Sequence, residues 1–221
     1  MLNLPEKLNM DSLALLNNET VMLDVIALSF DYQDKLLLNN IQFSLGAGQL
    51  LHLQGANGKG KTTLLKLLAG LLTPNEGEIQ LDGESSTKDS ISYQRMLCYI
   101  GHKSGLNPLF TVRENCLFDL HWGRRSISFE RLLEGFGLQG LEDEFCYHLS
   151  AGQQRRVSLL RIAMTDARLW LLDEPLVALD TEAILTLKLC VENHLEQGGQ
   201  VVLTSHQGLP FLRQTYQEYS L

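Results

Sequence analysis

An eight-residue stretch rich in glycine constrains the fold of this chain more than any other feature. The sequence GANGKGKT at 55–62 fits the pattern G-x-x-x-x-G-K-[ST] and lies between an apolar segment at 50–54 and a run of helix-forming residues from Thr62. Glycines let the main chain turn tightly, so that successive N–H groups point at one set of anionic oxygens. The pattern therefore predicts a strand, a phosphate-binding loop and a helix, in that order.

The residue types in this loop suit the triphosphate of ATP together with Mg²⁺. Lys61 supplies a cation for the β and γ phosphates, and the Thr62 hydroxyl is a hard oxygen ligand for the metal. We expect the Lys59 side chain to point to solvent, because a loop of this kind binds phosphate mainly through its backbone. The expected nucleotide contacts in the loop are Gly55, Ala56, Asn57, Gly58, Lys59, Gly60, Lys61, Thr62 and Thr63.

Two adjacent carboxylates end a second apolar run. In LWLLDEP, four apolar residues precede Asp173 and Glu174. A carboxylate pair at the end of a buried strand needs a reason, because burying charge without a partner is costly. Downstream of a phosphate loop, we interpret Asp173 as part of the magnesium shell. We interpret Glu174 as the catalytic base that orients and deprotonates the attacking water.

Strand and helix patterns alternate along the chain. Residues 168–173 and 200–205 are predicted to be buried strands, with a helix at 181–196 between them. The helix after the phosphate loop is expected to end at Pro74. Helical periodicity predicts a mostly helical insertion at about 104–165. The alternation predicts an α/β fold with a largely parallel, doubly wound sheet that binds its ligand at the carboxyl ends of the strands.

Composition and charge narrow the possible classes of protein. A net charge of -8 argues against a protein that gains affinity by neutralising nucleic-acid phosphates. The four cysteines are scattered without C-x-x-C spacing, which indicates neither a disulfide framework nor a zinc site. No apolar run approaches the ~18 residues of a membrane span, so work at a membrane would need another chain to carry the spans. For residues 1–21 two interpretations stay open, a disordered extension or a native start at Met22.

A third motif carries a resemblance to a known family. LSAGQ at 149–153 differs by one residue from the LSGGQ signature of ATP-binding cassette (ABC) ATPases, and it precedes the Asp173–Glu174 strand as in that family. The resemblance covers nearly everything from Met22 to the C-terminus. It implies an ABC-type P-loop NTPase over 22–221, with a mostly parallel core, an N-terminal antiparallel β subdomain and the helical subdomain described above.

The signature motif has a physical interpretation and an implied one. Ser150, Gly152 and the start of a helix make a second anion site from a hydroxyl, small residues and main-chain N–H groups. The resemblance implies that this site, including Gln153, completes the ATP site of a facing subunit in a head-to-tail homodimer. Asp180, in the sequence VALD, resembles the end of the family's D-loop, which couples the two sites.

Four ring side chains receive their roles from the resemblance. His206 looks like the switch histidine that reaches the γ-phosphate, and Tyr32 matches the aromatic residue that stacks on adenine. Phe30 is a weaker candidate for stacking, and either aromatic residue could instead belong to the core. Counting back from TVREN at 111–115 puts His102 at the position of the Q-loop glutamine. An imidazole could ligate or hydrogen-bond to the metal through water, so coordination by this loop stays open.

Several stretches resemble one subfamily, the ATP-binding subunits of the haem exporter in bacterial cytochrome c maturation. They are IGH at 100–102, LSAGQQRRV, LWLLDEP and EQGGQVVLTSHQ. This implies a peripheral ATPase on the cytoplasmic face of the inner membrane, bound to transmembrane subunits of a haem-handling complex, with ATP and Mg²⁺ as cofactors and no nucleic acid. Two alternatives stay open: a small ABC ATPase for another cargo, such as a lipid or drug, and a soluble ABC protein outside transport.

Overall fold

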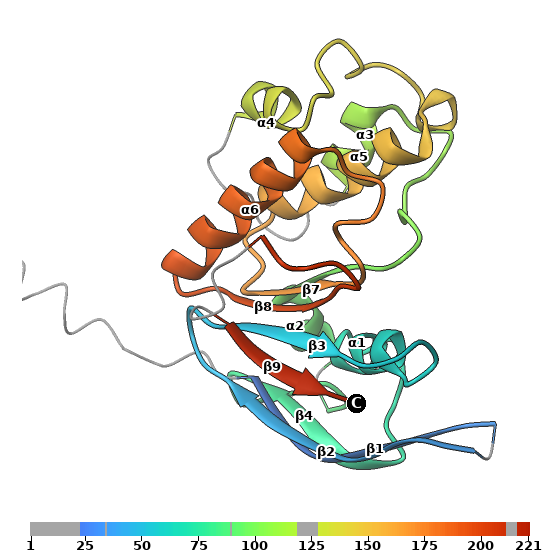
Figure 1. Ribbon diagram of the computed structural model, residues 1–221, viewed down its shortest axis with the longest axis vertical. Coiled ribbons are helices and arrows are strands. Elements are labelled where there is room, and N and C mark those ends of the chain that lie inside the picture. Colours follow the sequence, from blue (N-terminus) through green and yellow to red (C-terminus); the bar gives the residue numbers. More distant parts are fainter. Residues whose placement is uncertain (1–22, 34, 89, 119–127, 211–215) are drawn as a thin grey trace, which may run out of the picture.

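The computed structural model describes residues 23–33, 35–88, 90–118, 128–210 and 216–221. The predicted N-terminal extension and the alternative start at Met22 lie outside these residues. In Figure 1 the described part of the chain forms an antiparallel sheet, a parallel sheet beside it, and a group of helices over the far side of the parallel sheet. This arrangement confirms the predicted α/β class with a mostly parallel core and an N-terminal antiparallel subdomain.

The antiparallel sheet begins with β1 (Leu23–Tyr32), whose buried face changes halfway along the strand. Val25 and Leu28 are both buried although they are three residues apart, because a bulge at Ala27, with φ 47°, shifts the register. Gly77 lies directly against the Ala27 carbonyl, where a Cβ atom would collide with it. The strand order is β2-β1-β4-β5, with β2 at Lys35–Leu45, β4 at Glu76–Leu81 and β5 at Glu84–Ser85.

The second sheet is parallel throughout, and its strand order is β6-β7-β8-β3-β9. All residues of β7 and β8 are buried, as expected for central parallel strands covered on both faces. The edge strands β6 and β9 are partly exposed and were not predicted. The bounds are Leu50–Gln54 for β3, Leu97–Ile100 for β6, Leu169–Leu172 for β7, Gln200–Thr204 for β8 and Tyr216–Ser220 for β9.

Two helices can be compared with individual predictions, whereas α2 was not predicted. The long helix α6 has the predicted bounds, Thr181–Glu196. In contrast, α1 (Lys61–Leu68) ends well before Pro74, so the predicted end was wrong. Gly70 follows the helix with φ 66°, and a glycine in this left-handed conformation stops a helix. The others are α2 (Ser90–Arg95), α3 (Val112–Phe118), α4 (Phe129–Gly135), the short 3-10 helix η3 (Cys146–His148) and α5 (Ala151–Met164).

The core lies on both faces of the parallel sheet. On β7, Trp170 and Leu172 belong to a cluster shared with the helices α3 to α6, whereas Leu169 and Leu171 belong to a cluster shared with α1 and the antiparallel sheet. Alternate side chains of β7 thus pack against the helices on one face of the parallel sheet and against α1 and the antiparallel sheet on the other. In the described ranges, no helix is long and apolar enough to cross a membrane.

Candidate active site

The carboxyl ends of the parallel strands bring the predicted motifs to one cavity of about 440 Å³. The phosphate loop follows β3, the carboxylate pair follows β7 and His206 follows β8. Because neighbouring parallel strands end at the same edge of a sheet, residues about 150 positions apart lie around one opening. The lining residues are Leu37, Asn57, Gly58, Gly60, Lys61, Thr62, Thr63, His102, Asp173, Glu174, Val177 and His206.

The phosphate loop has the conformation that only glycine adopts without strain. Gly58 and Gly60 have φ values of 81° and 99°. A Cβ atom on Gly60 would also lie 2.8 Å from Leu38 Cδ2, so a larger residue would displace this side chain in addition to straining the backbone. Gly60 begins α1 without a side-chain cap, and the first N–H groups of the helix face the loop. Lys59 is exposed, as predicted.

Lys61 is 9% exposed, and its ammonium group lies inside the loop. Its Nζ donates to the carbonyls of Gly55 at 2.6 Å and Ala56 at 3.3 Å. A cation is thereby placed among main-chain N–H donors and a helix amino end. This combination binds anions such as phosphate.

Asp173 is buried at 2% exposure, and two hydroxyls satisfy its carboxylate. Thr62 Oγ1 donates to one carboxylate oxygen at 2.9 Å, and Thr204 Oγ1 donates to the other at 3.0 Å. The Thr62 hydroxyl and the Asp173 carboxylate are hard oxygen donors, and Mg²⁺ takes one or two such ligands together with phosphate oxygens and water. The donor set at this point of the cavity therefore fits Mg²⁺.

Glu174 has a strained backbone, with φ 51°, and its side chain turns toward the end of β8. Its N–H donates to Thr204 Oγ1 at 2.9 Å, and its Oε2 accepts from the main-chain N–H of His206 at 3.2 Å. Its Oε1 lies 3.5 Å from His206 Nε2, is buried and accepts no hydrogen bond from the described residues. An acceptor of this kind at the edge of a phosphate site can take a hydrogen bond, and then a proton, from water.

His102 lines the phosphate-loop cavity from the strand end of β6, and it also lines a second cavity of about 430 Å³. The second cavity continues along residues 103–105. Its lining also includes Lys66, in the last turn of α1, and Arg161 on α5. His102 is exposed, and because it lines both cavities it marks the boundary between them. The structure thus places His102, the position that resembles the Q-loop glutamine, in the lining of the phosphate-loop cavity.

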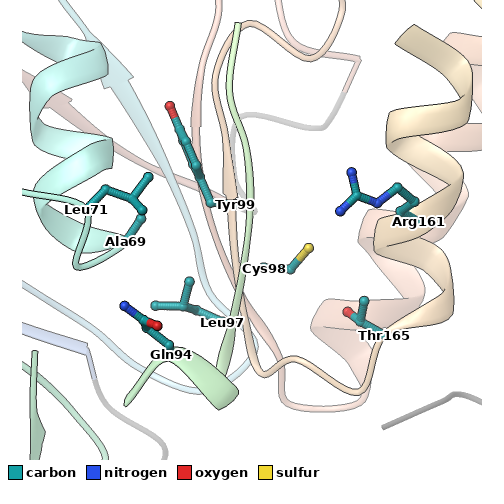
Figure 2. Close-up of a pocket in the computed structure, with 8 residues that line it drawn as sticks. All are labelled: Ala69, Leu71, Gln94, Leu97, Cys98, Tyr99, Arg161 and Thr165. Carbon is teal, nitrogen blue, oxygen red and sulfur yellow. The ribbon is translucent and has the colours of Figure 1, made fainter. Parts of the chain in front are cut away.

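A third cavity, of about 250 Å³, adjoins the second one and shares Tyr99 and Arg161 with it. Figure 2 shows how it lies over β6, with Arg161 on the α5 side and Leu71 on the α1 side. Burial, reinforced by the charge of Asp173, raises the pKa of Tyr99 to about 12, so its hydroxyl stays neutral. The lining residues are Ala69, Leu71, Gln94, Leu97, Cys98, Tyr99, Arg161 and Thr165.

The signature residues do not line the phosphate-loop cavity of their own chain. Ser150 and Gln153 instead form a reciprocal cap at the start of α5, with Gln153 N–H donating to Ser150 Oγ at 3.2 Å and Ser150 N–H donating to Gln153 Oε1 at 2.8 Å. A Cβ atom on Gly152 would lie 3.1 Å from the Ala178 carbonyl. The signature therefore lies against the segment that leads to Asp180.

Asp180 joins α5 to α6. One carboxylate oxygen accepts from the N–H of Ala183 at 3.0 Å and caps α6, and the other pairs with Arg156 Nη2 on α5 at 2.9 Å. Asp180 lies outside the cavity lining. Its bonds fix the start of α6 to α5.

The two aromatic candidates have different environments. Phe30 is buried in the core cluster with the antiparallel sheet, which agrees with the alternative that it is a core residue. Tyr32, at the end of β1, is 59% exposed and does not line the phosphate-loop cavity. Its ring is accessible to a partner such as a base.

Two residues that the sequence did not single out make close contacts with the carboxylate pair. Thr204 binds both Asp173 and the backbone of Glu174, and Arg155 donates to the carbonyls of both residues. The sequence pattern that could have identified Arg155 is its position on α5, three and four residues before the buried Ser158 and Leu159, which places a charged side chain on the buried face of the helix. A polar residue ending the apolar run QVVLT was the signal for Thr204.

Known proteins are similar to this chain in sequence and in fold. A family model described as ABC transporter matches residues 38–177. A protein from Legionella pneumophila (strain Lens), named cytochrome c biogenesis ATP-binding export protein CcmA, is 54% identical over 200 residues, covering 90% of this chain and 100% of that one. The solved ATP-binding subunit of an ABC transporter has a TM-score of 0.78 and 28% identity, covering 84% of this chain and 79% of that chain. A dimeric ATP-binding cassette in a post-hydrolysis state, bound to ADP and phosphate, has a TM-score of 0.72 and 25% identity, covering 84% and 88%.

Proposed function

The chain belongs to the ABC transporter family, and from this premise we propose that it is the ATP-hydrolysing subunit of a membrane exporter in cytochrome c biogenesis, serving haem export or release of a haem chaperone. The observation that carries the ATPase part is the buried, unbonded Oε1 of Glu174 at the edge of a cavity lined by the phosphate loop. The name of the Legionella pneumophila relative, identical at 54% of aligned positions, carries the export part.

Nucleotide binding uses the phosphate loop. Its main-chain N–H groups surround the β and γ phosphates, and Lys61 exchanges its carbonyl partners for phosphate oxygens. Thr62 and Asp173 would hold Mg²⁺, which when bound neutralises charge on the phosphates. We place Tyr32 against the adenine ring, since its exposed ring can stack on a base.

Hydrolysis depends on the end of β7. Glu174 accepts a proton from the attacking water through Oε1, and His206, 3.5 Å away, holds the γ-phosphate side of the site. His102 approaches the same cavity from β6 and would help to hold the metal, either directly or through its water shell. The negative charge that develops on the phosphate is met by Lys61 and the helix amino end.

The second half of each site comes from a facing copy of the chain. Ser150, Gly152 and Gln153 lie outside their own cavity, at the amino end of α5, where they suit the phosphates of an ATP bound to the other subunit. Asp180, tied to α5 through Arg156, lies beside them and couples the two sites. The fold similarity to a dimeric cassette with ADP and phosphate supports a head-to-tail homodimer.

The membrane partner docks on the two adjoining cavities over β6. These spaces combine apolar side chains such as Leu71 with the cations of Lys66, Lys103 and Arg161, and no acidic side chain from the described part of the chain lines them. A transmembrane subunit with a short cytoplasmic segment of apolar and acidic residues would fill them, with further contacts along 104–148. The chain would then lie peripherally on the cytoplasmic face of the inner membrane.

The proposal is tested on the complex isolated from membranes through a tag on this chain. We expect the wild-type complex to hydrolyse ATP with Mg²⁺ and to contain haem-handling membrane proteins. Lys61→Ala should lose nucleotide affinity, whereas Glu174→Gln should bind ATP and lose at least about 100-fold in turnover. Unchanged turnover in Glu174→Gln would remove the residue from its assigned role, and a complex with lipid- or drug-handling partners instead would contradict the haem assignment.

A further inference from the structure

Arg155 lies on α5 only five residues after Ser150, and it is 7% exposed. Its guanidinium makes three short hydrogen bonds to main-chain carbonyls. Nη1 donates to Gly101 O at 2.7 Å, and Nη2 donates to Asp173 O at 2.7 Å and to Glu174 O at 2.8 Å. One side chain therefore joins the ends of two strands, β6 and β7, directly beneath the catalytic cavity.

The buried guanidinium of Arg155 makes these three hydrogen bonds to neutral main-chain carbonyls. Burial lowers the pKa of the Arg155 guanidinium, and the nearby charges of Asp173 and Glu174 oppose that effect. A guanidinium stays protonated under such conditions and has a fixed planar set of donors. The carbonyls that it binds belong to Asp173, to Glu174 and to the residue before His102, so each one sets the direction of a side chain in the cavity.

Glu174 is the residue that most needs such support. Its φ of 51° is rarely adopted by residues with a side chain, and such a conformation persists only where the surroundings hold it on several sides. Thr204 Oγ1 accepts the hydrogen bond from its N–H, and Arg155 Nη2 donates to its carbonyl. The two bonds hold both peptide groups of Glu174 and so determine where its carboxylate points.

We propose that Arg155 is a positioning residue for hydrolysis, which fixes Glu174 and the His102 segment relative to each other through their main-chain carbonyls. The inference rests on the proposed function, because it takes Glu174 as the base. Arg155 does not itself line the cavity, and its hydrogen bonds reach the main chain of Gly101, Asp173 and Glu174 but no residue of the phosphate loop. Its removal should therefore disturb the geometry of the chemical step and spare the binding of ATP.

The test compares Arg155→Met and Arg155→Lys with the wild type in the membrane complex. Mg-ATP affinity and single-turnover hydrolysis are measured separately. We expect Arg155→Met to lose about 100-fold in the hydrolysis rate, since a misplacement of about 1 Å costs this much, while the Kd for Mg-ATP stays within about threefold. Arg155→Lys keeps the charge but cannot span three carbonyls, so its rate should lie between the two.

Arg168→Met is the matched control. Arg168 precedes β7 at the opposite end of the strand from Asp173 and pairs with Asp82, so its loss should leave hydrolysis within about twofold. The thermal midpoint of each variant shows whether it is folded; if Arg155→Met is unfolded, the reduced rate and retained affinity of Arg155→Lys decide. Wild-type rates in the arginine variants, or a Kd that rises in proportion to the fall in rate, would overturn the proposal. A wild-type complex without ATPase activity would instead refute the proposed function.

Discussion

Replacing Thr204 by valine should destabilise the protein far more than a change of one atom type suggests. Thr204 is 0% exposed, and its hydroxyl both donates to Asp173 Oδ1 at 3.0 Å and accepts from the Glu174 N–H at 2.9 Å. Valine has the same shape but neither capability. Thr204→Val thus leaves a buried carboxylate oxygen and a buried N–H group without their partner.

The magnitude follows from the two lost bonds. A hydrogen bond to a charged group contributes about 1.5 to 3 kcal/mol, and an unsatisfied buried N–H costs about 1 to 3 kcal/mol. Together they should lower the free energy of unfolding by about 2.5 to 6 kcal/mol. In a chain of 221 residues, this corresponds to a fall of roughly 5 to 24 °C in the thermal midpoint.

Thr204→Ser is the control, because it keeps the hydroxyl and removes only a methyl group. Its expected loss is about 1 kcal/mol, or roughly 2 to 4 °C. Thermal unfolding followed by circular dichroism, without nucleotide and at one pH, gives both midpoints. If the valine variant melts within about 3 °C of the serine variant, the two hydrogen bonds do not carry the stability assigned to them.

Two further predictions concern β6 and the segment that follows it. His102→Gln should change the Mg²⁺ concentration required for half-maximal ATPase activity, because it restores the amide expected at this position of the cavity, and superimposable metal titrations would argue against metal contact. Tyr99 has a folded-state pKa raised to about 12 from a usual value near 10, so its contribution to stability is complete below pH 10 and is lost as the pH rises toward 12. The free energy of unfolding should fall over this range, and Tyr99→Phe should make the fall shallower in denaturant titrations; equal slopes would rule out Tyr99 as the titrating group.

Motif order gave the main features of the fold and of the site because the physics behind it is local. A strand that runs into glycines and then a helix, such as 50–68, has few ways to fold, and parallel strands end at a common edge. The bounds of α6 were predictable because Asp180 caps one end and Gly198, with φ 83°, follows the other. Edge strands β6 and β9 were missed because their side chains are only partly buried and show no clear period.

The missed residues of the site depend on contacts that no local pattern records. Arg155 binds carbonyls that are 54, 18 and 19 residues away, and a main-chain acceptor leaves no mark on the residue type that carries it. In contrast, the signature residues were identified correctly as a helix start, but their separation from the phosphate loop follows from where α5 lies in the fold. The sequence therefore predicts which motifs belong to such a site more easily than it predicts how far apart they lie in the folded protein.

Asp173 and Glu174 show how two adjacent carboxylates acquire different chemistry. Asp173 directly follows β7, and its two oxygens receive hydrogen bonds from Thr62 and Thr204, which hold the carboxylate in place for the metal-binding role that we propose. The backbone then turns at the positive φ of Glu174, so that its side chain points toward His206 instead of continuing the pleat. A base must have an acceptor that no protein donor occupies, and Oε1 meets this condition among the described residues. The local backbone conformation, more than the residue type, therefore separates the two roles that we propose for these carboxylates.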